Sequence, residues 1–116
     1  MRPLDDNTFK LSEVLKEGQT VEVKYLSTGC MLASSKLIED MVKAYPDLEY
    51  DQNGTDKIAY ALYQPYIHVQ PSGFREYLSE DWAFCQRAID IGYSVWADGS
   101  IKCGHWGLIK YDFEEE

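Results

Sequence analysis

The sequence is poor in basic residues. Only 11 Lys and Arg stand against 20 Asp and Glu among 116 residues, which gives a formal net charge of −9. A surface of this sign repels phosphate backbones and anionic lipid headgroups, so the composition argues against non-specific binding to nucleic acid or to a membrane surface. Neutral or cationic partners fit better, as does an anion that is held through a metal ion.

Cysteine is scarce and long apolar runs are missing. Cys30, Cys85 and Cys103 are an odd number without Cys-x-x-Cys spacing, so we predict reduced core thiols rather than a disulfide framework or a zinc motif. No apolar run approaches the ~20 residues that span a bilayer, and the first residues lack the apolar core of a signal peptide. We therefore expect a soluble, cytoplasmic protein.

The apolar content is sufficient for one core. The chain is 45% hydrophobic and 14% aromatic, which at this length predicts a single domain over residues 1–116. No internal repeat and no linker divides it.

Hydrophobic periodicity predicts an α/β protein with three helices. The first covers residues 8–16, the second begins at Ser34 or Ser35 and is stopped by Pro46, and the third covers residues 80–91, with Ser79 as its N-cap and Gly92 after its end. Alternating segments predict strands at residues 20–32, with a bend or break at Gly29, and at residues 93–97 and 101–103. The tyrosine-rich run at residues 58–67 suits either a hairpin or one strand between two loops. The apolar residues of the third helix lie on two faces, which predicts burial on more than one side.

Three stretches, residues 28–32, 77–88 and 92–107, combine into one pattern. A strand with a small-residue turn is followed by a helix that opens with Glu80 and Asp81, and then by a strand that leads to His105 between two glycines. In this order and spacing the stretches resemble the C-terminal, acceptor-side half of GT-A glycosyltransferases, family 2-like. The likeness covers residues 21–111.

This resemblance implies a fold and a site. The fold would be a partial GT-A (nucleotide-diphospho-sugar transferase-like) arrangement, with about three helices on a small sheet that is mostly antiparallel or mixed. Asp81 would be the general base that accepts the proton of a sugar hydroxyl, and Glu80 would bind the acceptor or exchange roles with it. His105 would help to hold a divalent cation, Mn or Mg, in the complete enzyme. Since the Gly92 turn should fold the following strand back along the third helix, these residues are expected to share one face, in a substrate-binding cleft lined by Thr28, Gly29 and Trp106.

Structural roles compete with these functional ones. Carboxylates in the first turn of a helix stabilise it by about 0.3–1 kcal/mol whatever the function, and a lone histidine such as His105 is commonly a satisfied structural residue. Core packing is the prediction for Trp82 and Trp96. Arg87 is predicted to be solvated or ion-paired.

The nucleotide-binding features of the resembled family are missing. The sequence contains no Asp-x-Asp and no glycine-rich phosphate loop, so nothing in it would hold a nucleotide diphosphate. The first hypothesis is therefore a glycosyltransferase half that transfers sugar to a saccharide acceptor only with a nucleotide-sugar-binding half-domain, and that alone is inactive and binds no metal. The second is a non-catalytic glycan- or protein-binding module. The strand at residues 20–32 would have lost its partners with the missing half, and such an exposed edge invites pairing with another chain. We therefore expect a homodimer that covers this edge or the donor-side apolar surface.

Overall fold

The computed structural model describes residues 2–4, 17–27, 30–101, 104–106 and 110–112, and for the last two segments it describes the backbone alone. The first predicted helix, residues 8–16, lies outside the described residues. In chain order the elements are β1 (Arg2–Pro3), β2 (Thr20–Tyr25), α2 (Ser35–Ala44), the short 3-10 helix η1 (Pro46–Leu48), β3 (Glu49–Asp51), β4 (Ile58–Tyr60), β5 (Tyr66–Val69), β6 (Arg75–Leu78), α3 (Glu80–Asp90), β7 (Val95–Asp98), β8 (Gly104–Trp106) and β9 (Lys110–Asp112).

All strand pairs in the described part of the chain are antiparallel. A three-stranded sheet has the order β1-β2-β7, and β3–β4, β5–β6 and β8–β9 form separate two-stranded hairpins. The α/β class is therefore confirmed, and so is antiparallel pairing, but these residues form several small sheets rather than one. They contain two α-helices, and the remaining predicted helix, residues 8–16, falls outside them. The physical reason is that the three hairpin pairs join strands close in sequence, which pair through short turns.

Helix α2 begins and ends where its sequence predicts. The Ser34 hydroxyl oxygen accepts a 3.1 Å hydrogen bond from the Leu37 amide, which satisfies one of the free N–H groups of the first turn. The helix ends at Ala44, before Pro46, and its apolar stripe places Met41 in full burial.

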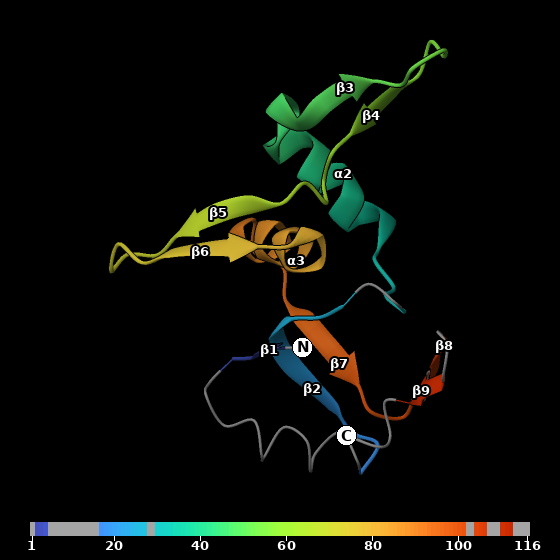
Figure 1. Cartoon of the computed structure of the whole chain (residues 1–116), viewed down its shortest axis with the longest axis vertical. Coiled ribbons are helices and arrows are strands. Elements are labelled where there is room, and N and C mark those ends of the chain that lie inside the picture. The colour runs from blue at the N-terminus through green and yellow to red at the C-terminus, as the bar shows by residue number, and fades with distance from the viewer. Residues whose placement is uncertain (1, 5–16, 28–29, 102–103, 107–109, 113–116) are drawn as a thin grey trace.

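Helix α3 is the centre of the structure and is buried on more than one side, as predicted. Figure 1 shows it between the β2–β7 pair on one side and α2 with the β5–β6 hairpin on the other. Ala83 and Cys85 belong to a core cluster with Tyr25 and Leu78, while Phe84 belongs to a second cluster with Met41 and Leu62.

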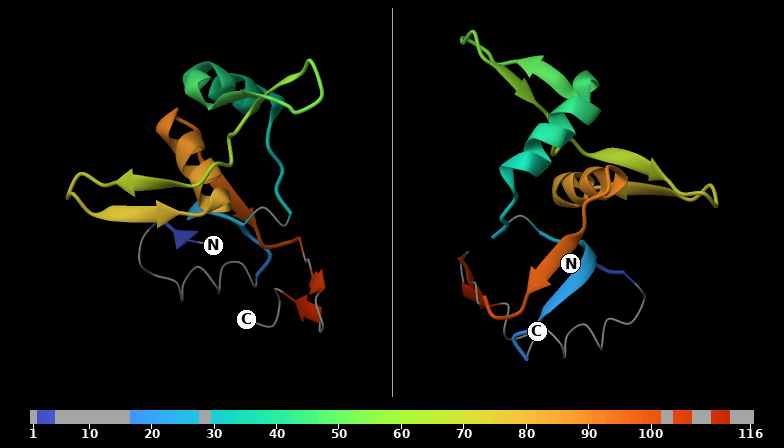
Figure 2. Two further views of the ribbon diagram at one scale, coloured as in Figure 1. Left: turned by 45° about the horizontal axis from the view of Figure 1, so that its top comes forward. Right: turned by 180° about the vertical axis from the view of Figure 1, so that it is seen from behind.

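Several predicted strand limits are wrong. The strand predicted over residues 20–32 ends at Tyr25. The tyrosine-rich run at residues 58–67 is divided between two hairpins, because β4 pairs back with β3 whereas β5 pairs forward with β6. Figure 2 shows the two hairpins extending in different directions. Pro65, which has no amide hydrogen for a sheet, lies between them.

The predicted core packing of Trp96 is wrong. Its side chain is 53% exposed, while Ala97 next to it is only 5% exposed. Successive side chains of a strand point to opposite faces, so the burial of Ala97 turns Trp96 outward. No helix among the described residues combines the length and the apolar character needed to cross a bilayer.

Candidate functional site

The start of α3 carries the two predicted catalytic carboxylates. Ser79 occupies the N-cap position with extended backbone angles, and its carbonyl oxygen accepts from the Ala83 amide at 2.7 Å, but its side chain makes no capping bond. Glu80 is exposed, whereas Asp81 is half-buried. The two adjacent carboxylates therefore differ in their access to water.

Asp81 lies within electrostatic range of two groups that pack against α3. Burial raises the pKa of Tyr63, with smaller contributions from Cys85 and Asp81. Burial also raises the pKa of the Cys85 thiol; a backbone hydrogen bond from Leu26 lowers it again and Asp81 raises it. Tyr63 in turn stacks on Phe84 with the ring centroids 4.3 Å apart and the planes 8° from parallel. Asp81 therefore lies near this aromatic pair.

The segments on both sides of Thr28 and Gly29 pack against α3. The Leu26 amide donates to the Cys85 sulfur at 3.4 Å, and Leu26 and Met31 both pack on the cluster that contains Ala83 and Cys85. Thr28 and Gly29 themselves lie outside the described residues, so their predicted role in substrate binding stays a prediction.

The predicted tight turn after α3 is confirmed at Gly92. Its φ angle is +97°, its amide donates to the Ile89 carbonyl at 2.9 Å, and the Tyr93 amide donates to the Ala88 carbonyl at 3.0 Å. These two bonds, with a glycine in positive φ after the helix end, form a Schellman motif. The motif ends α3 and starts the connection to β7.

His105 and Trp106 lie in β8, where His105 is paired with Tyr111 and Trp106 with Lys110. Figure 1 shows β8 in the chain beyond β7, which pairs with β2 so that Asp98 lies opposite Thr20. Since only the backbone of β8 is described, the metal-binding role of His105 and the substrate-binding role of Trp106 stay predictions, as does the face they would share with Asp81. Within the described residues, no group of three or more His, Cys, Asp or Glu side chains could hold a metal ion.

A buried arginine is the polar feature that the sequence did not predict. Arg87 is only 6% exposed, its Nη1 donates to the Leu62 carbonyl at 2.8 Å, and its guanidinium lies 4.7 Å from the centroid of the Tyr66 ring. Burial lowers the pKa of Arg87. The prediction that Arg87 is solvated or ion-paired is therefore wrong within the described residues. Its guanidinium is buried and contacts a carbonyl oxygen and an aromatic ring instead.

Comparison with known proteins adds no assignment, because no protein family, curated protein or solved structure matches this chain.

Proposed function

We propose that this chain is the acceptor-side half of a glycosyltransferase, which works together with a donor-binding half on a separate chain or elsewhere in a longer protein. One observation supports this most. Leu26 and Met31, on either side of Thr28 and Gly29, pack on the α3 cluster, and α3 begins with Glu80 and Asp81. The segments proposed to bind the acceptor and to activate it are thus anchored to the same helix.

In this proposal Asp81 is the general base. Its carboxylate accepts the proton of the acceptor hydroxyl while the hydroxyl oxygen forms a bond to the anomeric carbon and the nucleoside diphosphate leaves. The half-buried position of Asp81 suits this task because removal from water strengthens its interaction with the hydroxyl. The exposed Glu80 binds other acceptor hydroxyls, and Trp106 offers a flat apolar face to the sugar ring.

A divalent cation, Mn or Mg, would neutralise the charge that develops on the leaving diphosphate when it is bound. In this chain His105 is the residue that would contribute to holding it. The described residues contain no set of three metal ligands, so the other ligands are assigned to the donor-binding half. The chain alone is therefore expected not to turn over nucleotide sugars.

The first test is the coding sequence that flanks this chain, which should encode a strand–helix half with Asp-x-Asp. The two halves together, given manganese and a panel of nucleotide sugars, should release nucleoside diphosphate, whereas this chain alone should not. Asp81→Asn should lower the rate at least ~100-fold because the proton loses its acceptor. Asp56→Asn is the matched control, since Asp56 is exposed in the β3–β4 connection.

Two outcomes would overturn the proposal: turnover by the isolated chain, or equal rates for Asp81→Asn and Asp56→Asn. A flanking region without such a half would favour the second candidate. A second candidate, a non-catalytic glycan- or protein-binding module, is favoured by the first turn of α3. Carboxylates at a helix start stabilise it through the helix dipole without any catalytic role. In that case Asp81→Asn would lower stability alone.

A further inference from the structure

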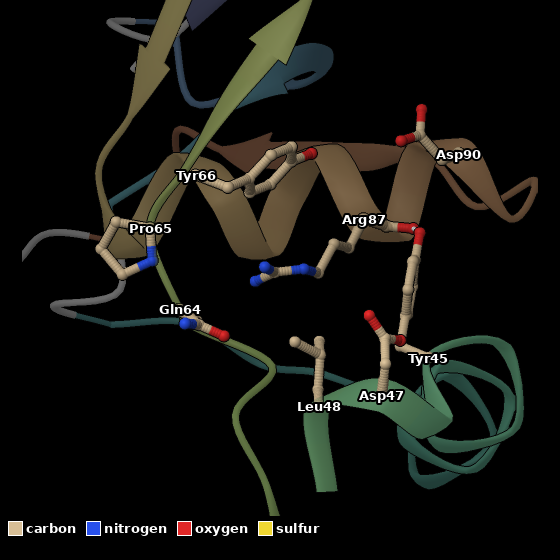
Figure 3. A pocket seen from close by; sticks show the side chains of 8 residues that line it. All are labelled: Tyr45, Asp47, Leu48, Gln64, Pro65, Tyr66, Arg87 and Asp90. Atoms are coloured by element: carbon tan, nitrogen blue, oxygen red, sulfur yellow. Dashed lines mark hydrogen bonds between the residues drawn. The ribbon is translucent and has the colours of Figure 1, made fainter.

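A pocket of about 390 Å³ lies beside the C-terminal half of α3. Three segments line it: Tyr45, Asp47 and Leu48 after α2, residues 64–66 at the start of β5, and Arg87 and Asp90 of α3. Figure 3 shows their side chains around a common space, with the Asp90 carboxylate at its rim and turned outward. Because Arg87 follows Glu80 by seven residues, and a helix rises 1.5 Å per residue, the pocket lies about 10 Å along α3 from the predicted catalytic carboxylates.

Arg87 supplies hydrogen-bond donors to this pocket. A guanidinium carries five N–H donors, and within the described residues the only hydrogen bond of this one is from Nη1 to the Leu62 carbonyl. No carboxylate among the described residues forms a salt bridge with the Arg87 guanidinium. Figure 3 shows the guanidinium directed between Gln64 and Tyr66, toward the space that they line.

Acceptors lie on another side of the pocket. Asp90 accepts from the Gln86 amide nitrogen at 2.7 Å, whereas Asp47 is exposed and receives no hydrogen bond from the part of the chain that the structure describes. The Tyr45 hydroxyl donates to the Arg87 carbonyl at 3.1 Å. Burial raises the pKa of Tyr45 and, to about 12, that of Tyr66. Both phenols are therefore neutral near pH 7.

The charges of the pocket select the ligand class. An anion would meet Asp47 and Asp90, and a cation would meet the Arg87 guanidinium, so a charged ligand is opposed from one side or the other. A hydroxyl group has neither problem, because it accepts from a guanidinium and donates to a carboxylate at the same time. The Tyr45 ring, Leu48 and Pro65 add apolar surface of the kind that the C–H face of a sugar ring contacts.

We propose that this pocket binds a neutral saccharide unit, with Arg87 as hydrogen-bond donor and Asp47 and Asp90 as acceptors. The volume lies within the range of small-molecule sites. The site is separate from the start of α3, and this inference does not rest on sugar transfer: it applies equally to a transferase half and to a binding module.

The test is an NMR titration of the ¹⁵N-labelled full chain with D-glucose, D-galactose, D-mannose and N-acetylglucosamine. At least one of these sugars should produce saturable shifts in the amides of residues 45–48, 64–66 and 87–90. Asp47→Asn should weaken its affinity about tenfold, because the acceptor loses its charge and a neutral amide oxygen makes a weaker hydrogen bond. Asp56→Asn, the same substitution at an exposed position away from the pocket, should leave the affinity unchanged.

Charged probes complete the test. D-glucuronate and D-glucosamine should bind more weakly than the neutral sugar, since each is repelled by one part of the pocket. The proposal is overturned if no neutral sugar gives saturable shifts, if a charged probe binds more tightly, or if Asp47→Asn and Asp56→Asn bind equally well. Shifts confined to Glu80, Asp81 and their neighbours would also overturn it, while supporting the acceptor site at the start of α3.

Discussion

The Tyr25 hydroxyl donates a 2.6 Å hydrogen bond to Oε1 of Gln86, and both side chains are buried. The Gln86 amide nitrogen then donates to Asp90 at 2.7 Å. This series of bonds connects β2 with the end of α3, and Asp90 belongs to the saccharide pocket proposed above. A buried side chain of α3, Gln86, thus links a core residue, Tyr25, to an exposed residue, Asp90.

Replacing Tyr25 with Phe should lower the free energy of unfolding by about 1–3 kcal/mol, because Gln86 then keeps a buried oxygen without a donor. Urea unfolding followed by circular dichroism measures the change. Tyr50→Phe is the control: Tyr50 is 49% exposed on β3, and its replacement should change stability by less than about 0.5 kcal/mol. Equal effects of the two substitutions would mean that the Tyr25–Gln86 bond adds no net stability.

Stability should fall at alkaline pH. Burial raises the pKa of Tyr25 and of Tyr66 to about 12, whereas tyrosine in an unfolded chain ionises near pH 10. The folded state holds these two protons more tightly, so their contribution is complete below about pH 10 and is lost as the pH rises toward 12. Urea unfolding across this range measures the decline. It should be shallower in the Tyr25→Phe, Tyr66→Phe double variant, and an identical slope would contradict the assignment.

Gly92→Ala should destabilise the protein through backbone strain alone. A Cβ added at Gly92 would meet no atom within 4 Å, but the φ angle of +97° is one that L-residues with a Cβ avoid, at a cost of about 1–2 kcal/mol. Gly92→Asn should cost less, because asparagine tolerates positive φ better than alanine does. Thermal unfolding orders the three proteins, and an alanine variant as stable as the parent would disprove the strain argument.

The thiols of Cys30 and Cys85 should differ strongly in reactivity. Cys30 is exposed, whereas Cys85 is 1% exposed and burial raises the pKa of its thiol; only the thiolate reacts. A short exposure to iodoacetamide, followed by peptide mapping, should find Cys30 alkylated well before Cys85. In urea the two rates should become similar. Equal rates in the folded protein would show that the packing of Leu26 over Cys85 is loose.

A homodimer remains a prediction, but not through the expected edge: the strand predicted at residues 20–32 is paired on both sides, because β2 lies between β1 and β7. Within the described residues β7 pairs on one side only, and Trp96 on it is 53% exposed. An unpaired edge with apolar side chains favours pairing with a second chain. Sedimentation at high micromolar concentration should detect a dimer that Trp96→Lys weakens and Tyr50→Lys, on a different hairpin, does not. A monomer throughout would contradict the prediction.

Local signals in the sequence predicted local structure well. Ser34, Pro46 and Gly92 mark the ends of helices through hydrogen bonds and backbone angles that depend on a few adjacent residues, so a short window is sufficient to read them. The two-sided burial of α3 was also predictable, because its apolar residues occupy two faces.

Pairing and long-range packing were not predictable in the same way. The tyrosine-rich run contains no signal for which neighbour each half pairs with, and residues 61–65 divide it between two hairpins. Core packing is the expectation for Trp96, but the alternation of the strand turns it outward. Arg87 was buried by contacts with Leu62 and Tyr66, both more than 20 positions earlier in the chain. Such contacts depend on tertiary structure that no local pattern contains.

The position of α3 in both core clusters has a consequence for motion in the native state. Opening either cluster alone leaves α3 packed against the other, so its amides should exchange with solvent deuterium only through global unfolding. The β5–β6 hairpin has Ile67, Val69 and Tyr77 about half exposed or more, and Leu78 is its one fully buried side chain. Its amides should exchange before those of α3. The edge of the saccharide pocket at Tyr66 should therefore open locally while the α3 side stays folded.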